Sequence, residues 1–214
     1  MASTLSTAVL SDDTASTTRP RQPTSGQPRR AAAGIAVVLV AQLMLILDLT
    51  VVNVALPHIN TALDFGTAGL SWVLNGYTLA FGGLLLLGGR LGDVFGRRRT
   101  FEIGVAVFTL GSLAGGLAQS AGWLIAARSA QGVGAALASP GVLALLTTSA
   151  PTQAARNRAL ALFGAVTSGG MSLGLLLGGA VTDAGSWRWT LFINVPIGAV
   201  VLALTRRLLD ETPR

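Results

Sequence analysis

The stretch Gly88-Gly89-Arg90-Leu91-Gly92-Asp93-Val94-Phe95-Gly96-Arg97-Arg98-Arg99 decides the fold of this chain, because it separates two long apolar runs. The runs cover Ser71–Leu87 and Phe101–Leu117. Each is close to the ~20 residues that a helix needs to cross the hydrocarbon core of a bilayer. Because arginines are retained on the cytoplasmic side of a membrane, the stretch predicts a tight cytoplasmic turn between two membrane-spanning helices.

The composition supports an integral membrane protein. Hydrophobic residues make up 51% of the 214 residues and charged residues only 11%, whereas a soluble domain carries about a quarter charged residues. All fifteen basic residues are arginine. Cysteine is absent and His58 is the only histidine, so the sequence excludes disulfides and argues against a metal site or a histidine-based catalytic set. We therefore expect an all-α membrane protein that is not an enzyme and holds no cofactor or metal.

The apolar runs predict three regions: a disordered cytoplasmic tail over residues 1–30, a transmembrane bundle over 31–205, and a cytoplasmic tail or linker over 206–214. Pro57 is expected to end the first span, with an outer connection over His58–Gly69. The six predicted spans are Ala31–Leu56, Ser71–Gly89, Phe101–Gln119, Trp123–Ser149, Ala159–Val181 and Leu191–Leu204.

The arginines sort by side in this scheme, which places both termini in the cytoplasm. Arg188 alone falls on the outer side, and Arg128 falls within a span. The inner set is Arg19, Arg21, Arg29, Arg30, Arg90, Arg97, Arg98, Arg99, Arg156, Arg158, Arg206, Arg207 and Arg214.

Asp48 and Arg128 are ionisable residues inside predicted spans, and such residues commonly mark ion or proton pathways. Counted from the outer ends of their spans, they lie ~12 Å and ~9 Å deep at the rise of an α-helix. The similar depth indicates that they pair or share a hydrated cavity. The alternatives are a purely structural pair, or an Arg128 that extends outward to the interface.

Other polar and small residues in the spans have less specific signals. Gly170, Gly174 and Gly178 recur every four residues and predict a smooth face for helix packing rather than ligand contact. Asn53, Tyr77 and Gln131 are possible substrate-cavity residues, although each is equally compatible with a bond between helices or with a lipid-facing position.

The opening stretch resembles the signature of the major facilitator superfamily, Gly-x-Leu-x-Asp-x-x-Gly-Arg-Arg, between its second and third helices. The resemblance implies a cytoplasmic gate formed by Gly89, Asp93, Gly96, Arg97 and Arg98. The alternative is a generic basic loop that only sets the topology, which explains the arginines but not the spacing of the glycines and the aspartate.

Three further stretches resemble the fourteen-span drug:proton antiporters of that superfamily. Leu47–Pro57 is similar to their first-span motif, Arg128–Ala136 to their fourth-span motif, and Ser186–Gly198 to the sequence that enters their sixth span. The resemblance assigns proton coupling to Arg128, with Asp48 as its candidate partner. Span five departs from the family at Leu175, where proline usually follows glycine, which weakens the assignment to antiport.

The resemblance as a whole implies the amino-terminal six-helix half of a superfamily bundle, with its 3+3 inverted repeat, in a multi-pass plasma-membrane protein. The implied function is proton-coupled efflux of small drug-like or cationic compounds. A small-nutrient proton symporter on the same fold and a non-transporting half-transporter fragment that acts as a membrane interaction protein remain alternatives. The expected partners are lipid, substrate, protons and a second six- or eight-helix half or a second copy, but no nucleic acid. We expect such a partner because, in one half alone, Asp48 and Arg128 would face lipid or a second copy of the chain.

Overall fold

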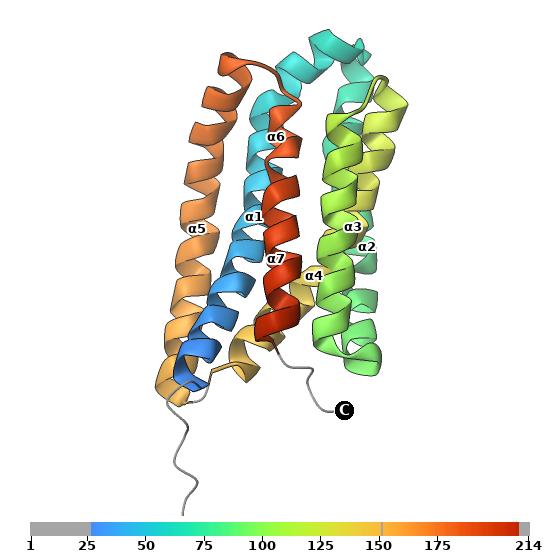
Figure 1. Ribbon diagram of the computed structural model, residues 1–214. Coiled ribbons are helices and arrows are strands. Elements are labelled where there is room, and N and C mark those ends of the chain that lie inside the picture. Colours follow the sequence, from blue (N-terminus) through green and yellow to red (C-terminus); the bar gives the residue numbers. More distant parts are fainter. Residues whose placement is uncertain (1–26, 151, 210–214) are drawn as a thin grey trace, which may run out of the picture.

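The computed structural model of the protein describes residues 27–150 and 152–209 (Figure 1). The regular structure of these residues is helical, which confirms the predicted all-α class for this part of the chain. The helices lie side by side in one bundle. In chain order they are α1 (Gln27–Leu63), α2 (Gly66–Phe95), α3 (Arg97–Gly116), α4 (Ala121–Thr148), α5 (Gln153–Ala184), α6 (Trp189–Phe192) and α7 (Asn194–Leu208).

Five helical stretches of the described residues are long and apolar enough to cross a membrane. They are α1, α2, α4, α5 and the combined stretch of α6 and α7. The remaining long helix, α3, packs among them, but its first turns contain three arginines and Glu102, which lower its average hydropathy. Each of the six predicted spans overlaps one of these six helical stretches.

The predicted boundaries of the first span were wrong at both ends. The helix α1 continues through Pro57 to Leu63, so most of the expected outer connection is helical. Proline removes only the hydrogen bond to the carbonyl of residue 53, and long membrane helices tolerate that loss. At the other end, residues 27–30 of the predicted tail belong to α1. The rest of that tail, residues 1–26, and residues 210–214 of the predicted linker lie outside the described residues.

The signature stretch is helical rather than a loop, which corrects a second prediction. Helix α2 extends to Phe95 and α3 begins at Arg97, so Gly96 alone separates them. Gly96 has a φ of 101°, a value that favours glycine. Gly88 serves close packing, because a Cβ atom there would collide with the carbonyl oxygen of Ala136 on α4. Pro140 has no N–H to donate to the carbonyl of Ala136 four residues earlier. That carbonyl group is therefore free to lie against Gly88 of α2.

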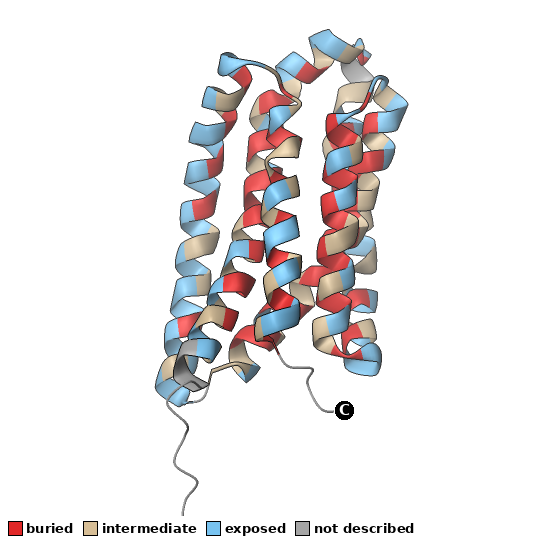
Figure 2. Cartoon of the chain, viewed as in Figure 1, coloured by how far each residue is buried: buried red, intermediate tan, exposed pale blue. Residues whose placement is uncertain are grey.

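The core lies where α4 packs against α2 and α3, and where α1 packs against α5 and α7. Figure 2 shows buried residues along α1 and α3, whereas α5 exposes most of its surface. Large side chains that are fully buried include Phe101 and Phe108 on α3 and Met44 on α1. In a membrane, the exposed apolar surface of α5 contacts lipid or another helix.

The last span is interrupted, which the prediction of one continuous span did not anticipate. Helix α6 ends at Phe192 and α7 begins at Asn194, with Ile193 between them. Pro196 explains the interruption, because it has no N–H to donate to the carbonyl of Phe192 four residues earlier. The interruption places Asn194 in the first turn of α7, buried in the bundle.

Candidate functional site

A buried ion pair joins α1 to α4 inside the bundle. Arg128 Nη1 lies 2.5 Å from Asp48 Oδ2, and the exposed fractions of the two residues are 0% and 1%. Burying two charges is costly unless they pair and their remaining polar atoms find hydrogen-bond partners. The structure therefore brings together the two residues whose depths predicted a pair, and Arg128 does not extend outward to the interface.

Three neutral side chains complete this polar cluster, which we define as Asp48, Arg128, Gln131, Ser112 and Asn194. Gln131 Nε2 and Asn194 Nδ2 donate to Asp48 Oδ1 at 2.9 and 2.8 Å. The same two amide nitrogens lie 2.7 and 3.3 Å from Ser112 Oγ, which accepts from both. The Asp48 carboxylate therefore accepts hydrogen bonds from two helices, from Arg128 and Gln131 on α4 and from Asn194 on α7.

Arg128 has further contacts with α2. Its Nε donates to the backbone carbonyl of Val73 at 3.3 Å, and its guanidinium carbon lies 4.6 Å from the centre of the Tyr77 ring. The Nη1 atom also donates to Gln131 Oε1 at 2.9 Å, whereas Nη2 is buried without a hydrogen-bond partner among the described residues. The ring contact is a cation–π interaction, which partly compensates the guanidinium for lost hydration.

Local sequence explains how the polar cluster fits. Arg128 and Gln131 are three residues apart, so they lie on one face of α4. Gly111 precedes Ser112 on α3, and a Cβ atom there would lie 2.8 Å from Gln131 Cγ. Gly132 likewise faces the backbone of Tyr77. Small residues let the helices approach closely enough for short side chains to reach one another.

The structure corrects the argument that Asp48 and Arg128 would face lipid without a second half. Both are covered by helices of the same chain. Of the possible cavity residues, Tyr77 and Gln131 are buried around Arg128, whereas Asn53 is exposed on α1 and does not join the polar cluster.

Ser112 and Asn194 were not predicted as site residues from the sequence. Both are buried polar residues in apolar segments, and that is the only signal by which they could have been found. The stretch around Asn194 was noted for its resemblance, but not for this residue.

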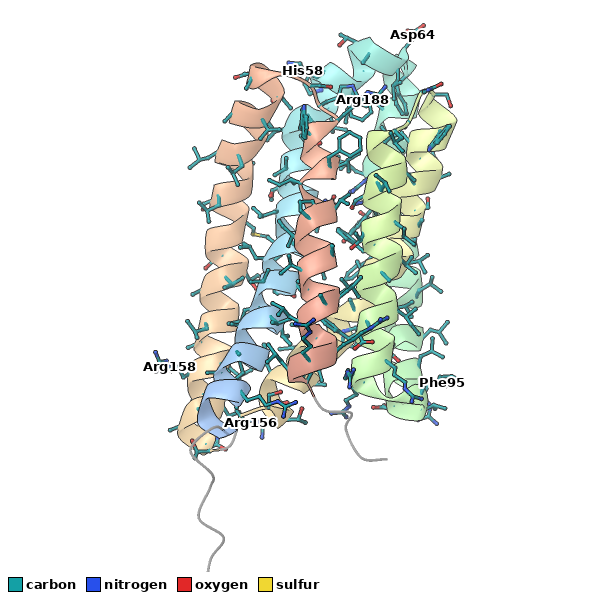
Figure 3. The ribbon with its side chains drawn as sticks, in the orientation of Figure 1. His58, Asp64, Phe95, Arg156, Arg158 and Arg188 are labelled. Carbon is teal, nitrogen blue, oxygen red and sulfur yellow. The ribbon has the colours of Figure 1, made fainter. Side chains whose placement is uncertain are left out.

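The signature residues lie at the opposite end of the bundle from His58, Asp64 and Arg188, as the position of Phe95 in Figure 3 shows. Arg97 Nη2 contacts Asp93 Oδ1 at 3.4 Å, and both side chains are substantially exposed. Arg98 Nε contacts Glu102 Oε1 at 2.9 Å. A pocket of about 210 Å³ between α2, α3 and α4 is lined in part by Gly89, Asp93 and Arg97.

A larger groove of about 630 Å³ adjoins this end of the bundle. Its lining combines the aromatic side chains of Phe81 and Phe163 with the polar residues Gln42, Arg90 and Ser139. Both the volume and the mixture of apolar walls with a few polar groups are typical of small-molecule sites.

The glycine face of α5 lies against α1. Cβ atoms at Gly170 and Gly178 would lie 3.0 Å from Leu43 and Val54, and one at Gly174 would collide with Thr50. Helix α5 is continuous across Leu175, where the resembled family has proline. The three glycines therefore occupy a packing interface and do not line any of the pockets described above.

Comparison with known proteins gives relatives over most of the chain. Residues 38–214 match the family model described as Major Facilitator Superfamily. The uncharacterized MFS-type transporter EfpA of Mycobacterium tuberculosis is 47% identical, over 94% of this chain and 38% of that protein. The puromycin resistance protein pur8 of Streptomyces alboniger is 48% identical, over 85% of this chain and 36% of that protein. The cephamycin export protein CmcT of Amycolatopsis lactamdurans is 49% identical, over 84% of this chain and 37% of that protein.

The chain thus spans little more than a third of the length of these relatives. Among solved structures, the proton:xylose symporter XylE aligns with a TM-score of 0.75 at 16% identity, over 87% of this chain and 46% of that chain. A peptide transporter, POT, aligns with a TM-score of 0.68 at 14% identity, over 86% of this chain and 41% of that chain. Similarity at these identities shows a shared fold.

Proposed function

Because the chain belongs to the major facilitator superfamily of transporters, we propose that it forms the amino-terminal half of a proton-coupled exporter of small drug-like or cationic compounds. The observation that carries the proposal is the buried ion pair between Asp48 and Arg128. The names of two relatives, a puromycin resistance protein and a cephamycin export protein, support the direction of transport.

The ion pair has the chemistry that proton coupling requires. A proton that binds Asp48 removes the negative charge and leaves the Arg128 charge buried without its counter-ion. Leaving one partner of a buried pair uncompensated costs about 3–5 kcal/mol. Protonation therefore favours any conformation in which Arg128 finds another partner or water, and so shifts the balance between two conformations.

The exposed pair Asp93–Arg97 is suited to a gate. Exposed ion pairs contribute about 0–1 kcal/mol, so either residue can exchange its partner at little cost. Gly96 alone separates the two helices that carry them. We propose that Gly89, Asp93, Gly96, Arg97 and Arg98 form a cytoplasmic gate that engages the helices of a second half.

The groove lined by Gln42, Phe81, Arg90, Ser139 and Phe163 is the proposed substrate-facing surface of this half. Its aromatic walls suit a flat or amphipathic compound, and its open side leaves room for a second half to complete the cavity. That half is either a separate six- or eight-helix unit or a second copy of this chain. The relatives, of which this chain covers little more than a third, support the first arrangement.

A gradient assay tests the proposal. Residues 1–214 are joined to the remaining part of the puromycin resistance protein of Streptomyces alboniger, reconstituted in liposomes and given a pH gradient of either sign. The 214-residue chain alone and the unaltered relative are measured in parallel with a fluorescent cationic dye. We expect the dye to move opposite to the protons in the chimera and not to move with the chain alone.

Other outcomes identify the alternatives. Movement of solute in the same direction as protons indicates a symporter. A chimera that inserts but transports nothing under either gradient, while the relative transports the dye, indicates a non-transporting protein. Robust transport by a confirmed monomer of the 214-residue chain contradicts the half-transporter proposal.

A further inference from the structure

Asn194 has an unpaired acceptor beside the Asp48 carboxylate. Its side chain is fully buried, and its Nδ2 donates to Asp48 Oδ1 at 2.8 Å and to Ser112 Oγ at 3.3 Å. Its carbonyl oxygen, Oδ1, is buried and has no hydrogen-bond partner in the part of the chain that the structure describes. A buried acceptor without a donor is unfavourable, so its presence beside an ionisable group calls for an explanation.

The other amide of the polar cluster cannot change its orientation in the same way. Gln131 Oε1 accepts from Arg128 Nη1 at 2.9 Å, while its Nε2 donates to both Asp48 and Ser112. Rotating this amide would turn its NH₂ group toward a guanidinium, which is a donor only. Gln131 is therefore held in one orientation by its partners on both sides, whereas Asn194 is held on one side.

We propose that Asn194 is a positioning residue that responds to the protonation of Asp48 by a half-turn of its side-chain amide. This rests on the proposed proton coupling through Asp48. In the carboxylate form the amide donates to Oδ1, as the structure has it. A proton taken up from water at Oδ1, on the side of Asn194, makes that atom a donor toward Asn194, while its remaining lone pair still accepts from Gln131 Nε2. The amide of Asn194 is then a donor facing a donor. A half-turn brings Asn194 Oδ1 to the proton.

Ser112 accommodates both orientations. Its hydroxyl accepts from the amide nitrogen in the observed state, and after the half-turn it can donate to the amide oxygen, because a hydroxyl is both donor and acceptor. Among the described charged and titratable groups, Arg128 from α4 contacts Asp48, and Tyr77 from α2 lies against the Arg128 guanidinium. The ionisable residues of α5 are Arg156, Arg158 and Asp183, near its two ends. Those of α7 are Arg206 and Arg207, in its last turn, and α6 has none.

The position of Asn194 gives the rotation a structural consequence. It begins α7 directly after the interruption at Ile193, where Pro196 has no N–H to donate to the carbonyl of Phe192. A change of hydrogen bonds at this residue acts on the junction of α6 and α7. The protonation state of Asp48 on α1 is thereby linked to the last span, formed by α6 and α7.

Infrared difference spectroscopy tests the proposal on the 214-residue chain itself. The chain is reconstituted in phosphatidylcholine and phosphatidylglycerol bilayers and cycled between alkaline and acidic buffer, with and without ¹³C at the side-chain carbonyl of its five asparagines. We expect the spectra to contain a carboxyl band from Asp48, which Asp48→Asn removes. We also expect an asparagine amide band pair that shifts with the label.

The variants separate the possible outcomes. Asn194→Leu should abolish the amide pair, whereas the matched control Asn157→Leu, at an exposed position of α5, should leave it unchanged. An Asp48 band accompanied by the same amide signals in Asn194→Leu as in the unaltered chain overturns the switch and leaves proton coupling intact. The absence of an Asp48 band at every pH contradicts both. If the labelled, unaltered chain shows no label-sensitive amide pair, the switch is overturned whether or not Asn194→Leu folds.

Discussion

Arg128 connects two other helices to its own through separate nitrogen atoms. Its Nε reaches the backbone of Val73 on α2, and its Nη1 reaches Asp48 on α1 as well as Gln131 on α4. The fixed fork of a guanidinium makes such contacts in different directions possible, whereas a lysine ammonium is a single compact point of charge. Arg128 therefore supports the packing of the bundle as well as its proposed chemistry.

Removing the Arg128 charge should destabilise the protein more than removing both charges. Arg128→Met leaves Asp48 buried without its counter-ion, which costs about 3–5 kcal/mol for a buried pair. Adding Asp48→Asn removes the uncompensated charge, so the double variant should recover part of the lost stability. Thermal unfolding of the purified chain in detergent measures both. A double variant that melts no higher than Arg128→Met would show that the charges are not coupled.

At the scale of single residues, the sequence predicted the charged pair of Asp48 and Arg128 but not its neutral neighbours. Two ionisable residues at similar depth are a strong signal because intramembrane charge is costly. Ser112 and Asn194 carry no comparable signal, since neutral polar residues in spans can equally bond to their own backbone. Their contacts depend on how α3 and α7 pack and on the interruption before Asn194. Pro196 is the sequence signal for that interruption, but it was not used to predict one.

Helix α5 packs against α1 through one face that is marked by glycines. Its glycines at positions 170, 174 and 178 face α1, while Gly179, one residue further round the helix, has open space at its Cβ position. In lipid, helices associate through such small-residue faces because the hydrophobic effect gives no preference for another helix over lipid tails. The adjacent glycines Gly178 and Gly179 thus have different roles.

Alanine substitution should separate these roles. Gly174→Ala places a Cβ atom where the side chain of Thr50 lies, and overpacking of this kind costs about 1–3 kcal/mol. We expect its melting temperature to fall by several degrees. Gly179→Ala meets no neighbour and should leave the melting temperature close to that of the unaltered chain. Equal effects of the two substitutions would exclude α1–α5 contact at Gly174.

The elements themselves were largely predictable, and their ends were not. Long apolar runs predicted the approximate position of each long helix, because hydrophobicity and length constrain a membrane helix strongly. Helix ends depend on local geometry: α1 continues through Pro57, and α2 and α3 retain helical structure up to Gly96. Charged residues near the ends of membrane helices were misread as loops, although a helix can extend beyond the hydrocarbon core into the headgroup region.

The whole molecule has two different ends. Phe95, Arg156 and Arg158 lie at one end of the bundle, and His58, Asp64 and Arg188 lie at the other (Figure 3). At the second end Arg188 donates to the backbone carbonyls of Gly116 and Ala118, so it caps the end of α3. The larger number of arginines at the Phe95 end predicts that this end is cytoplasmic.

Cysteine labelling tests this orientation without background, because the chain has no cysteine. Phe95→Cys and Thr61→Cys introduce single thiols at exposed positions of the two ends. In intact cells, a membrane-impermeant thiol reagent should label the cysteine at position 61 and spare the one at position 95 until the cells are opened. Rapid labelling at position 95 in intact cells would reverse the assigned topology.

Proton-coupled export through the Asp48–Arg128 pair is tested most directly by Asp48→Asn in the chimeric transporter. Asp183→Asn, at an exposed position near the end of α5, is the matched control. Both variants are reconstituted at equal amounts, and dye movement is measured under an imposed pH gradient. We predict that Asp48→Asn inserts normally but moves no more dye than protein-free liposomes, while Asp183→Asn retains transport. Undiminished gradient-driven transport by Asp48→Asn would contradict the account.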